Sequence, residues 1–264
     1  MKLYYTNERY ANPLICPTSD VGHLRVFMYA KCMPSRKITF APGEYYHLCN
    51  RGLDGRLIAS TDREYARLLF LIVFLQSTRA YSHPSREVSD FIKTGKFLDV
   101  AEEQLIASER TVSLVCFCIM KNHFHLLVRE EIDDGISWYL QRIENAYTRY
   151  FNLSHERRGH LFQGPFRAVH IETNDQLLYT SAYIHRNPRE IKKWKDREHL
   201  YQWSSLSDYI ATKSRWPSLL CQEPIMSQFD NGQDYKNYVS SSIAKLSPEE
   251  LNELNLSNIG GWTF

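Results

Sequence analysis

The order of hydrophobic patterns along the chain predicts an α+β fold with an antiparallel sheet, laid out as a ferredoxin-like split β-α-β unit. Strand-forming residues dominate four short segments: 44–49, 112–120, 123–129 and 166–171. Apolar residues at helical spacing mark three longer ones: 60–76, 133–152 and 174–187. Strands and helices therefore alternate as strand, helix, strand, strand, helix, strand and helix, which is the order that this layout requires.

The first strand and helix are bounded by turn and capping residues. Residues 44–49 are rich in strand formers and end at Asn50-Arg51-Gly52, a turn signal. Ser60-Thr61-Asp62 then offers a helix cap, and the helix is predicted to run to about residue 76. Residues 79–110 follow as an insertion, which is rich in Ser, Arg and Pro at first and then helical and charged.

The second and third strands form the centre of the predicted sheet. Residues 112–120 are apolar at alternate positions on both faces, which predicts a central strand that is buried on both sides. A tight connection at residues 120–122 favours antiparallel pairing with 123–129. Phe124 is expected to face the core, so that His123 and His125 project together from the other face.

The second half of the unit repeats this pattern. A long helix covers residues 133–152, a short strand 166–171, and a capped helix starts at Asn174 and stops before Pro188. We predict a domain at 33–215 and a helical C-terminal extension with a polar tail at 216–264. Residues 1–32 show no periodicity, which suggests a loose arm or a translation start assigned too early.

Bulk composition excludes few functions. The 264 residues carry 32 Lys and Arg against 30 Asp and Glu, so a nucleic-acid interface would have to come from local clusters rather than from net charge. Six scattered cysteines without a CxxC pair favour reduced structural thiols over a disulfide or metal role. Without an apolar run of membrane-spanning length or a signal pattern, we expect a cytoplasmic protein with no membrane partner.

Two histidines and a tyrosine form the most informative constellation. His123 and His125 lie two positions apart, so on a strand they are about 7 Å apart on one face and can share a cation. Alone, this pair is more typical of two polar residues on the open face of a half-exposed strand. The predicted helix at 174–187 adds Tyr179, Tyr183 and Asn187 on one face. A lone tyrosine at such a position usually packs, but the combination with two histidines is much rarer by chance.

Four segments together resemble a known family. They read MKNHFHLLV at 120–128, YTRYFN at 147–152, GHLFQG at 159–164 and YIHRNP at 183–188. In this order they are similar to the REP-associated tyrosine transposases, which belong with the insertion-sequence-200-like single-tyrosine transposases. The similarity extends from about Tyr45 to Tyr209. The HFH segment alone is weakly specific, whereas four segments in this order are strongly so.

The resemblance implies an HUH nuclease fold and a set of site residues. Tyr183 would be the nucleophile, and a divalent ion, Mg²⁺ or Mn²⁺, would be held by His123, His125 and Asn187. The enzyme would nick and rejoin single-stranded DNA near a small hairpin through a 5′-phosphotyrosine link, as a monomer or a homodimer. Residues 189–191 and 165–167 depart from the family pattern, which puts the DNA-sequence specificity in doubt.

The residue types suit the chemistry that the resemblance implies. Two imidazoles and an amide oxygen leave coordination positions open, which suits Mn²⁺ or Mg²⁺ better than a closed zinc site. Arginines near aromatic residues predict contacts with phosphates and unpaired bases, although an amphipathic helix with a solvated charged face explains each of them equally well. The predicted DNA contacts are Arg51, Arg142, Arg149, Arg167 and Arg186.

Several alternatives remain open at this point. One is a DNA-binding or regulatory relative without catalysis, and another is a structural-zinc or metallohydrolase domain, which needs a third strong ligand. A further reading takes the motifs as accidental in a protein without catalysis. Tyr147, Tyr150 and Tyr179 are rival nucleophiles. His185, two residues from Tyr183, is expected to point away from the site and to serve packing or a DNA contact.

Overall fold

The computed structural model describes residues 38–79, 84–95 and 99–245. The predicted N-terminal arm at 1–32 lies outside the described residues, as does the tail beyond residue 245. Within the part of the chain that the structure describes, no helix is both long and apolar enough to cross a bilayer.

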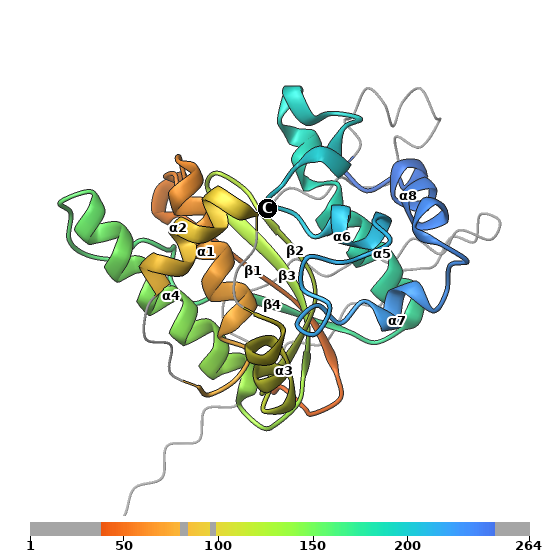
Figure 1. Ribbon diagram of the computed structural model, residues 1–264, viewed down its shortest axis with the longest axis horizontal. Coiled ribbons are helices and arrows are strands. Elements are labelled where there is room, and N and C mark those ends of the chain that lie inside the picture. The colour runs from red at the N-terminus through yellow and green to blue at the C-terminus, as the bar shows by residue number, and fades with distance from the viewer. Residues whose placement is uncertain (1–37, 80–83, 96–98, 246–264) are drawn as a thin grey trace, which may run out of the picture. The chain divides into compact units, whose positions relative to one another are not determined.

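A four-stranded antiparallel sheet forms the centre of the fold (Figure 1). Its strands are β1 (Tyr45–Arg51), β2 (Val112–Ile119), β3 (His123–Glu130) and β4 (Arg167–Ile171), and they lie in the order β2-β3-β1-β4. β1 pairs antiparallel with both β3 and β4, and β2 pairs antiparallel with β3. This order is that of the split β-α-β layout, so the predicted ferredoxin-like α+β fold is confirmed.

Helices cover both faces of the sheet. Figure 1 shows α1 (Asp62–Phe74) and α4 (Gly135–Ser154) on one side and α5 (Asn174–His185) on the other. The segment predicted as an insertion holds α2 (Pro84–Thr94) and α3 (Val100–Ser108). Beyond α5 the elements are short: η2 (Asn187–Glu190), η3 (Lys192–Trp194), η4 (Glu198–Leu200), α6 (Leu206–Ile210), α7 (Glu223–Met226) and α8 (Gly232–Ser241).

The two helices of the α1–α4 layer begin at well-defined caps. At α1, Thr61 and Glu64 form a reciprocal capping box. At α4, the buried Glu130 carboxylate accepts the backbone N–H of Ile136 at 2.7 Å. A Cβ at Gly135 would collide with the backbone carbonyl of Thr111, so only glycine fits this close approach between α4 and the start of β2.

The prediction that residues 112–120 form a central strand is wrong, because β2 lies at an edge of the sheet. All eight of its residues are nevertheless buried. Its outer edge is covered by residues 203–221, where Ile119 donates to the carbonyl of Trp203 at 2.9 Å and Cys221 donates to the carbonyl of Leu114 at 2.8 Å. The apolar run therefore correctly indicated that the strand is buried. It does not indicate whether another strand or a covering segment lies along the outer edge of that strand.

Apolar and polar side chains alternate along the first half of β3, so that its two faces differ in chemistry. Phe124, Leu126 and Val128 are fully buried, and the Phe124 ring packs edge-on against Phe162 with ring centroids 5.8 Å apart. Phe162 in turn contacts Tyr147 of α4. His123 and His125 occupy the alternate positions of the strand and face the α5 layer, as the strand period predicts.

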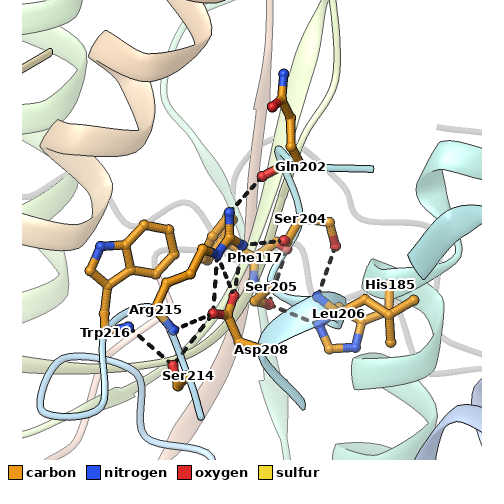
Figure 2. A network of polar contacts seen from close by, with 10 residues as sticks. All are labelled: Phe117, His185, Gln202, Ser204, Ser205, Leu206, Asp208, Ser214, Arg215 and Trp216. Atoms are coloured by element: carbon orange, nitrogen blue, oxygen red, sulfur yellow. Dashed lines mark hydrogen bonds and ion pairs between the residues drawn. The ribbon is translucent and has the colours of Figure 1, made fainter. Parts of the chain in front are cut away.

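A polar network fixes the end of α5 (Figure 2). His185 lies between two hydroxyls, with Nε2 at 2.8 Å from Ser205 Oγ and Nδ1 at 2.7 Å from Tyr235 of α8. Ser205 Oγ also accepts the backbone N–H of Phe117 in β2 at 2.8 Å. Nearby, Arg215 donates to both carboxylate oxygens of Asp208, from Nε to Oδ1 at 3.1 Å and from Nη2 to Oδ2 at 2.7 Å. These bonds tie α5 to β2, α6 and α8, so residues just before and after His185 have defined positions.

Candidate metal and nucleophile site

His123 and His125 meet at the wall of a cavity on the α5 side of the sheet. Their ring centroids are 5.0 Å apart and the rings are nearly perpendicular, at 85°. The cavity has a volume of about 740 Å³. Its lining combines the two histidines with amides, basic side chains and one carboxylate: Asn50, Arg51, Lys121, Asn122, Gln163, Arg167, Lys192, Lys245 and Glu190.

Asn187 faces His123, although it does not lie on α5 as predicted. The helix ends at His185, and Asn187 is the first residue of η2. Its amide nitrogen donates to the backbone carbonyls of Tyr183 at 2.9 Å and Ile184 at 3.3 Å. Those two bonds fix the orientation of the amide, so that Oδ1 points at His123 Nε2 from 3.5 Å.

The contact of Nδ1 of His123 indicates which of its two ring nitrogens carries the hydrogen. Nδ1 lies 2.8 Å from Oδ1 of Asn122, an acceptor, so we assign the ring hydrogen to Nδ1. Nε2 then carries a lone pair, and it faces the lone pairs of Asn187 Oδ1. Two acceptors at this distance repel each other unless a cation lies between or beside them. The donor set therefore fits a divalent ion that accepts nitrogen and oxygen ligands.

Burial keeps these imidazoles neutral, which is the form that binds a metal. Burial lowers the pKa of His125 well below its usual value, and the neighbouring His47, His123 and Lys245 lower it further. Burial also lowers the pKa of His123, with Lys245 adding to the effect and Glu190 opposing it. Within the described residues, no group of three or more His, Cys, Asp or Glu side chains could hold a metal ion.

Tyr183 lies beside the histidines, as the sequence predicted. Its ring is perpendicular to that of His125, with centroids 5.6 Å apart. Only 4% of the residue is exposed, its hydroxyl is buried, and it does not line the cavity. Burial raises the pKa of Tyr183 above its usual value, and the charge of Glu190 raises it further. In this arrangement the phenol is protonated and enclosed, next to the ring of a candidate metal ligand.

Two rival tyrosines lie in the other layer of the fold. Tyr147 and Tyr150 both belong to α4. The Tyr147 hydroxyl donates to the carbonyl of Ile58 at 2.5 Å, and its ring packs toward the Phe162 cluster. The ring of Tyr150 lies under the guanidinium of Arg67, 5.0 Å from its centroid. Neither shares a face of the sheet with His123 and His125, so neither is placed to act with them.

The predicted arginines divide into separate groups. Arg51 and Arg167 line the cavity. Across the sheet, Arg51 pairs with His123, and Arg167 pairs with Cys49. Arg142 donates to backbone carbonyls of Ser77 and Arg79, and Arg149 is exposed on α4. Both belong to the layer opposite the histidines. These two arginines are therefore not brought together with the cavity.

Arg186 requires a correction. Only 2% of it is exposed, and its guanidinium donates to the carbonyls of Val239 at 2.8 Å and Ser240 at 2.6 Å. The side chain therefore holds the end of α8 against α5. Because a buried guanidinium engaged in this way offers no surface to a phosphate, the predicted DNA contact at Arg186 is not supported, and the residue serves the fold.

His185 turns away from the site, as predicted. It is fully buried in the network of Figure 2, and burial lowers its pKa to about 3. Its place between Ser205 and Tyr235 gives it a structural role.

Three residues of the site were not singled out from the sequence. Lys245 follows α8, and its ammonium lies 4.6 Å from the centroid of the Tyr183 ring and 2.5 Å from a carboxylate oxygen of Glu190. Glu190 belongs to η2, and both residues line the cavity. His47 of β1 contacts His125. No local pattern marks these residues, because each reaches the site through long-range packing or strand register.

Comparison with known proteins places part of this chain in a family context. Residues 87–187 match the family model described as "Transposase IS200 like". That segment contains His123, His125, Tyr183 and Asn187. No curated protein matches the chain.

One solved structure is described as the REP-associated tyrosine transposase bound to a REP hairpin. It is 14% identical, covers 69% of this chain and 87% of its own, and has a TM-score of 0.47. A likeness of this degree says nothing about activity. The resemblance to the IS200-like transposases, first indicated by four short motifs, is confirmed by the family match over residues 87–187.

Proposed function

We propose that this protein is a metal-dependent DNA transposase or endonuclease that nicks and rejoins single-stranded DNA through a covalent link to Tyr183. Two atoms support this most: His123 Nε2 and Asn187 Oδ1 lie 3.5 Å apart, and both carry lone pairs when the ring hydrogen of His123 is assigned to Nδ1. They lie next to His125, whose ring touches that of Tyr183. The proposed cation site at the wall of the basic cavity and the buried phenol therefore lie side by side.

Each side chain has a role in this proposal. His123, His125 and Asn187 would hold one divalent ion, Mg²⁺ or Mn²⁺. When bound, the ion would supply Lewis-acid stabilisation to the phosphodiester and its leaving oxygen. Arg51, Arg167 and the lysines that line the cavity would bind the phosphates of the strand. The neutral imidazoles are already in the protonation state that the ion needs.

Tyr183 would perform the covalent step. Its phenolic oxygen attacks phosphorus, the phenolic proton leaves to solvent, and the bond from phosphorus to the 3′-oxygen breaks. The leaving 3′-oxygen takes up a proton, and the 5′ phosphate stays on the tyrosine. A second 3′-hydroxyl can reverse the attack, so cleavage and rejoining need no separate energy source. The hydroxyl is buried, and therefore it has to turn into the cavity before it can attack.

The partner is proposed to be single-stranded DNA at or beside a small hairpin. The preference for a hairpin rests on the motif resemblance, and the similar solved structure is described as bound to a REP hairpin. The cavity fits an unpaired strand, because arginine, lysine and amide side chains line it together. We propose a cytoplasmic protein that acts as a monomer or a homodimer.

A labelled hairpin-flanked oligonucleotide pool, incubated with the protein and Mn²⁺, tests this function. Wild type should form a covalent protein–DNA adduct and release a strand with a 3′-hydroxyl, whereas Tyr183→Phe should form neither. Tyr179→Phe, one helical turn earlier on α5, is the matched control and should cut normally. Cutting by Tyr183→Phe at the wild-type rate would overturn the assignment of the nucleophile.

A second function has its own support. The Lys245 ammonium already lies over the Tyr183 ring and beside Glu190, which provides a positive charge at the site from the chain itself. This arrangement favours a regulatory DNA-binding protein without catalysis. The same oligonucleotide experiment separates the two, because a binding protein would retain the hairpin in a gel shift and leave it uncut at every Mn²⁺ concentration.

A further inference from the structure

His47 is a third histidine in contact with the site, and it belongs to neither the predicted ligands nor the cavity lining. It is buried on β1, with 8% exposed. Its Nε2 lies 2.9 Å from Nδ1 of His125, and the two rings stack at 26° with centroids 5.1 Å apart. The His47 ring also meets the Tyr183 ring edge-on at 5.8 Å.

Strand register produces this contact. Cys49 of β1 pairs with His125 of β3, and His47 pairs with Leu127. Directly paired residues share a face of the sheet, and so do residues two apart on one strand. His47 is therefore the diagonal neighbour of His125 on the α5 side, and the two imidazoles reach each other without distortion. A histidine one position earlier or later on β1 would face the other layer.

The contact constrains which nitrogen of His125 can bind a ligand. Because Nδ1 of His125 is engaged by His47, only Nε2 remains for an ion. A hydrogen bond between two neutral imidazoles needs one donor and one acceptor. If His47 donates, the hydrogen of His125 stays on Nε2 and blocks it. If His47 accepts, the hydrogen lies on Nδ1 and the Nε2 lone pair is available.

We infer that His47 is a positioning residue that accepts the Nδ1–H of His125 and thereby presents the Nε2 lone pair of His125 to a divalent cation. The inference rests on the proposed function in so far as it takes His125 as a ligand. Metal-bound histidines in proteins usually donate their second N–H to a fixed acceptor, and loss of that acceptor typically weakens metal binding by about 10–100-fold. Here a buried imidazole takes the place of the usual carboxylate or carbonyl.

The tautomer of His125 can be read without any metal or DNA. Long-range ¹⁵N–¹H correlation spectra of the imidazoles, assigned with a His125→Gln variant, distinguish a hydrogen on Nδ1 from one on Nε2. In wild type, the expected signal is that of the Nδ1–H form. A wild-type spectrum with the hydrogen of His125 on Nε2 would overturn the inference, whatever the nuclease assay shows.

Metal affinity provides the second readout. Mn²⁺ titrations, followed by the electron paramagnetic resonance of free Mn²⁺, should show about a 10–100-fold weaker dissociation constant for His47→Phe. His47→Gln should stay near wild type, because its amide oxygen can accept at the position of Nε2. His170→Gln is the matched control, since His170 on β4 bonds Glu44 instead. Wild-type affinity in a folded His47→Phe would contradict the role of His47.

The two readouts keep the failures apart. If wild type shows the Nδ1–H tautomer but binds no Mn²⁺, the proposed function fails and the hydrogen bond stands. If Mn²⁺ binds and DNA is cut, but the affinity does not respond to residue 47, the positioning role fails alone. If His47→Phe does not fold, as thermal denaturation would reveal, the wild-type spectrum still decides the question, because a hydrogen on Nε2 of His125 would overturn the inference.

Discussion

Two buried polar clusters, one around His185 and one around Asn187, hold the same end of α5. They differ in whether each hydrogen-bond acceptor has a donor. Around His185, the order can run from Phe117 N–H to Ser205 Oγ–H to His185 Nε2. From His185 Nδ1–H it continues to the Tyr235 hydroxyl and on to Ser181. Each acceptor in this chain meets a donor.

Around Asn187, the acceptors are not all matched by donors. The amide nitrogen is committed to two carbonyls, and Oδ1 faces Nε2 of His123, to which we assign no hydrogen because the contact of Nδ1 with Asn122 Oδ1 places it on Nδ1. Both clusters are buried parts of one fold, yet only the second has a place where a positive charge would lower the energy. The difference teaches that a satisfied network stabilises a fold, whereas facing acceptors beside a cavity mark a ligand site.

The largest expected effect is at the incomplete cluster. His123→Ala should reduce DNA cleavage at least about 100-fold, because it removes a proposed ligand of an ion that would supply several kcal/mol of charge stabilisation. The side chain is half-buried, so the free energy of unfolding should change by less than about 1 kcal/mol. Cleavage assays and urea unfolding measure the two. His170→Ala, on β4, is the control, and normal cutting by His123→Ala would place the ion elsewhere.

The complete cluster should behave in the opposite way. His185→Asn should lower the free energy of unfolding by roughly 2–4 kcal/mol, because it breaks two buried hydrogen bonds and leaves a gap between Ser205 and Tyr235. Urea denaturation at pH 7 measures the loss. The variant should still bind Mn²⁺ when folded. A stability equal to wild type would show that the network of Figure 2 contributes little.

The same residue should control part of the pH dependence of stability. Burial lowers the pKa of His185 to about 3, whereas an exposed histidine in the unfolded chain titrates near about 6.5. Between these values the unfolded state binds a proton that the folded state does not, so stability falls as the pH falls. The slope is at most about 1.4 kcal/mol per pH unit.

Urea unfolding at several pH values between about 6.5 and 4.5 isolates this contribution. The difference between wild type and His185→Asn should shrink as the pH falls, because the variant lacks this one titrating group. Other groups, such as Glu130, whose pKa burial raises to about 7, cancel in the difference. A difference that is constant with pH would mean that His185 is not held neutral.

A smaller effect is expected at the residue that supplies positive charge to the site. Lys245→Met removes an ammonium next to the two histidines and leaves the Glu190 carboxylate more attractive to a cation. Because the Glu190 side chain is 46% exposed and water screens its charge, we expect the Mn²⁺ dissociation constant to fall only about 2–5-fold. Lys236→Met on α8 is the control. Weaker Mn²⁺ binding by Lys245→Met would show that the lysine supports the site instead.

The sequence predicts those parts of the fold and site that depend on local periodicity. The two-residue period of β3 predicts that Phe124 faces the core and that His123 and His125 share the other face. Capping at Thr173 and the stop before Pro188 predict the helix that carries Tyr183, which is found at 174–185. Such features are fixed by a few neighbouring residues, so a single sequence carries them.

Features that depend on distant contacts were not predictable in the same way. The apolar run of β2 indicates burial but does not distinguish a central strand from an edge strand covered by residues 203–221. Arginine is a residue type that is typical of surface contacts, but α8 packs over Arg186. His47 needs the β1–β3 register, and Lys245 arrives from a segment beyond α8. Only the alternation of Tyr45, His47 and Cys49 hints at the face that His47 takes.

Direct titration of the metal-free protein with Mn²⁺ tests most directly whether the facing acceptors mark a cation site. Wild type should bind one ion per chain in a saturable manner. Asn187→Ala should weaken that binding by roughly tenfold, because it removes Oδ1, the oxygen of the facing pair. His185→Asn, from the complete cluster, should bind as wild type does. Absence of saturable binding in wild type, or equal affinity in Asn187→Ala, would contradict the assignment of this cluster as the metal site.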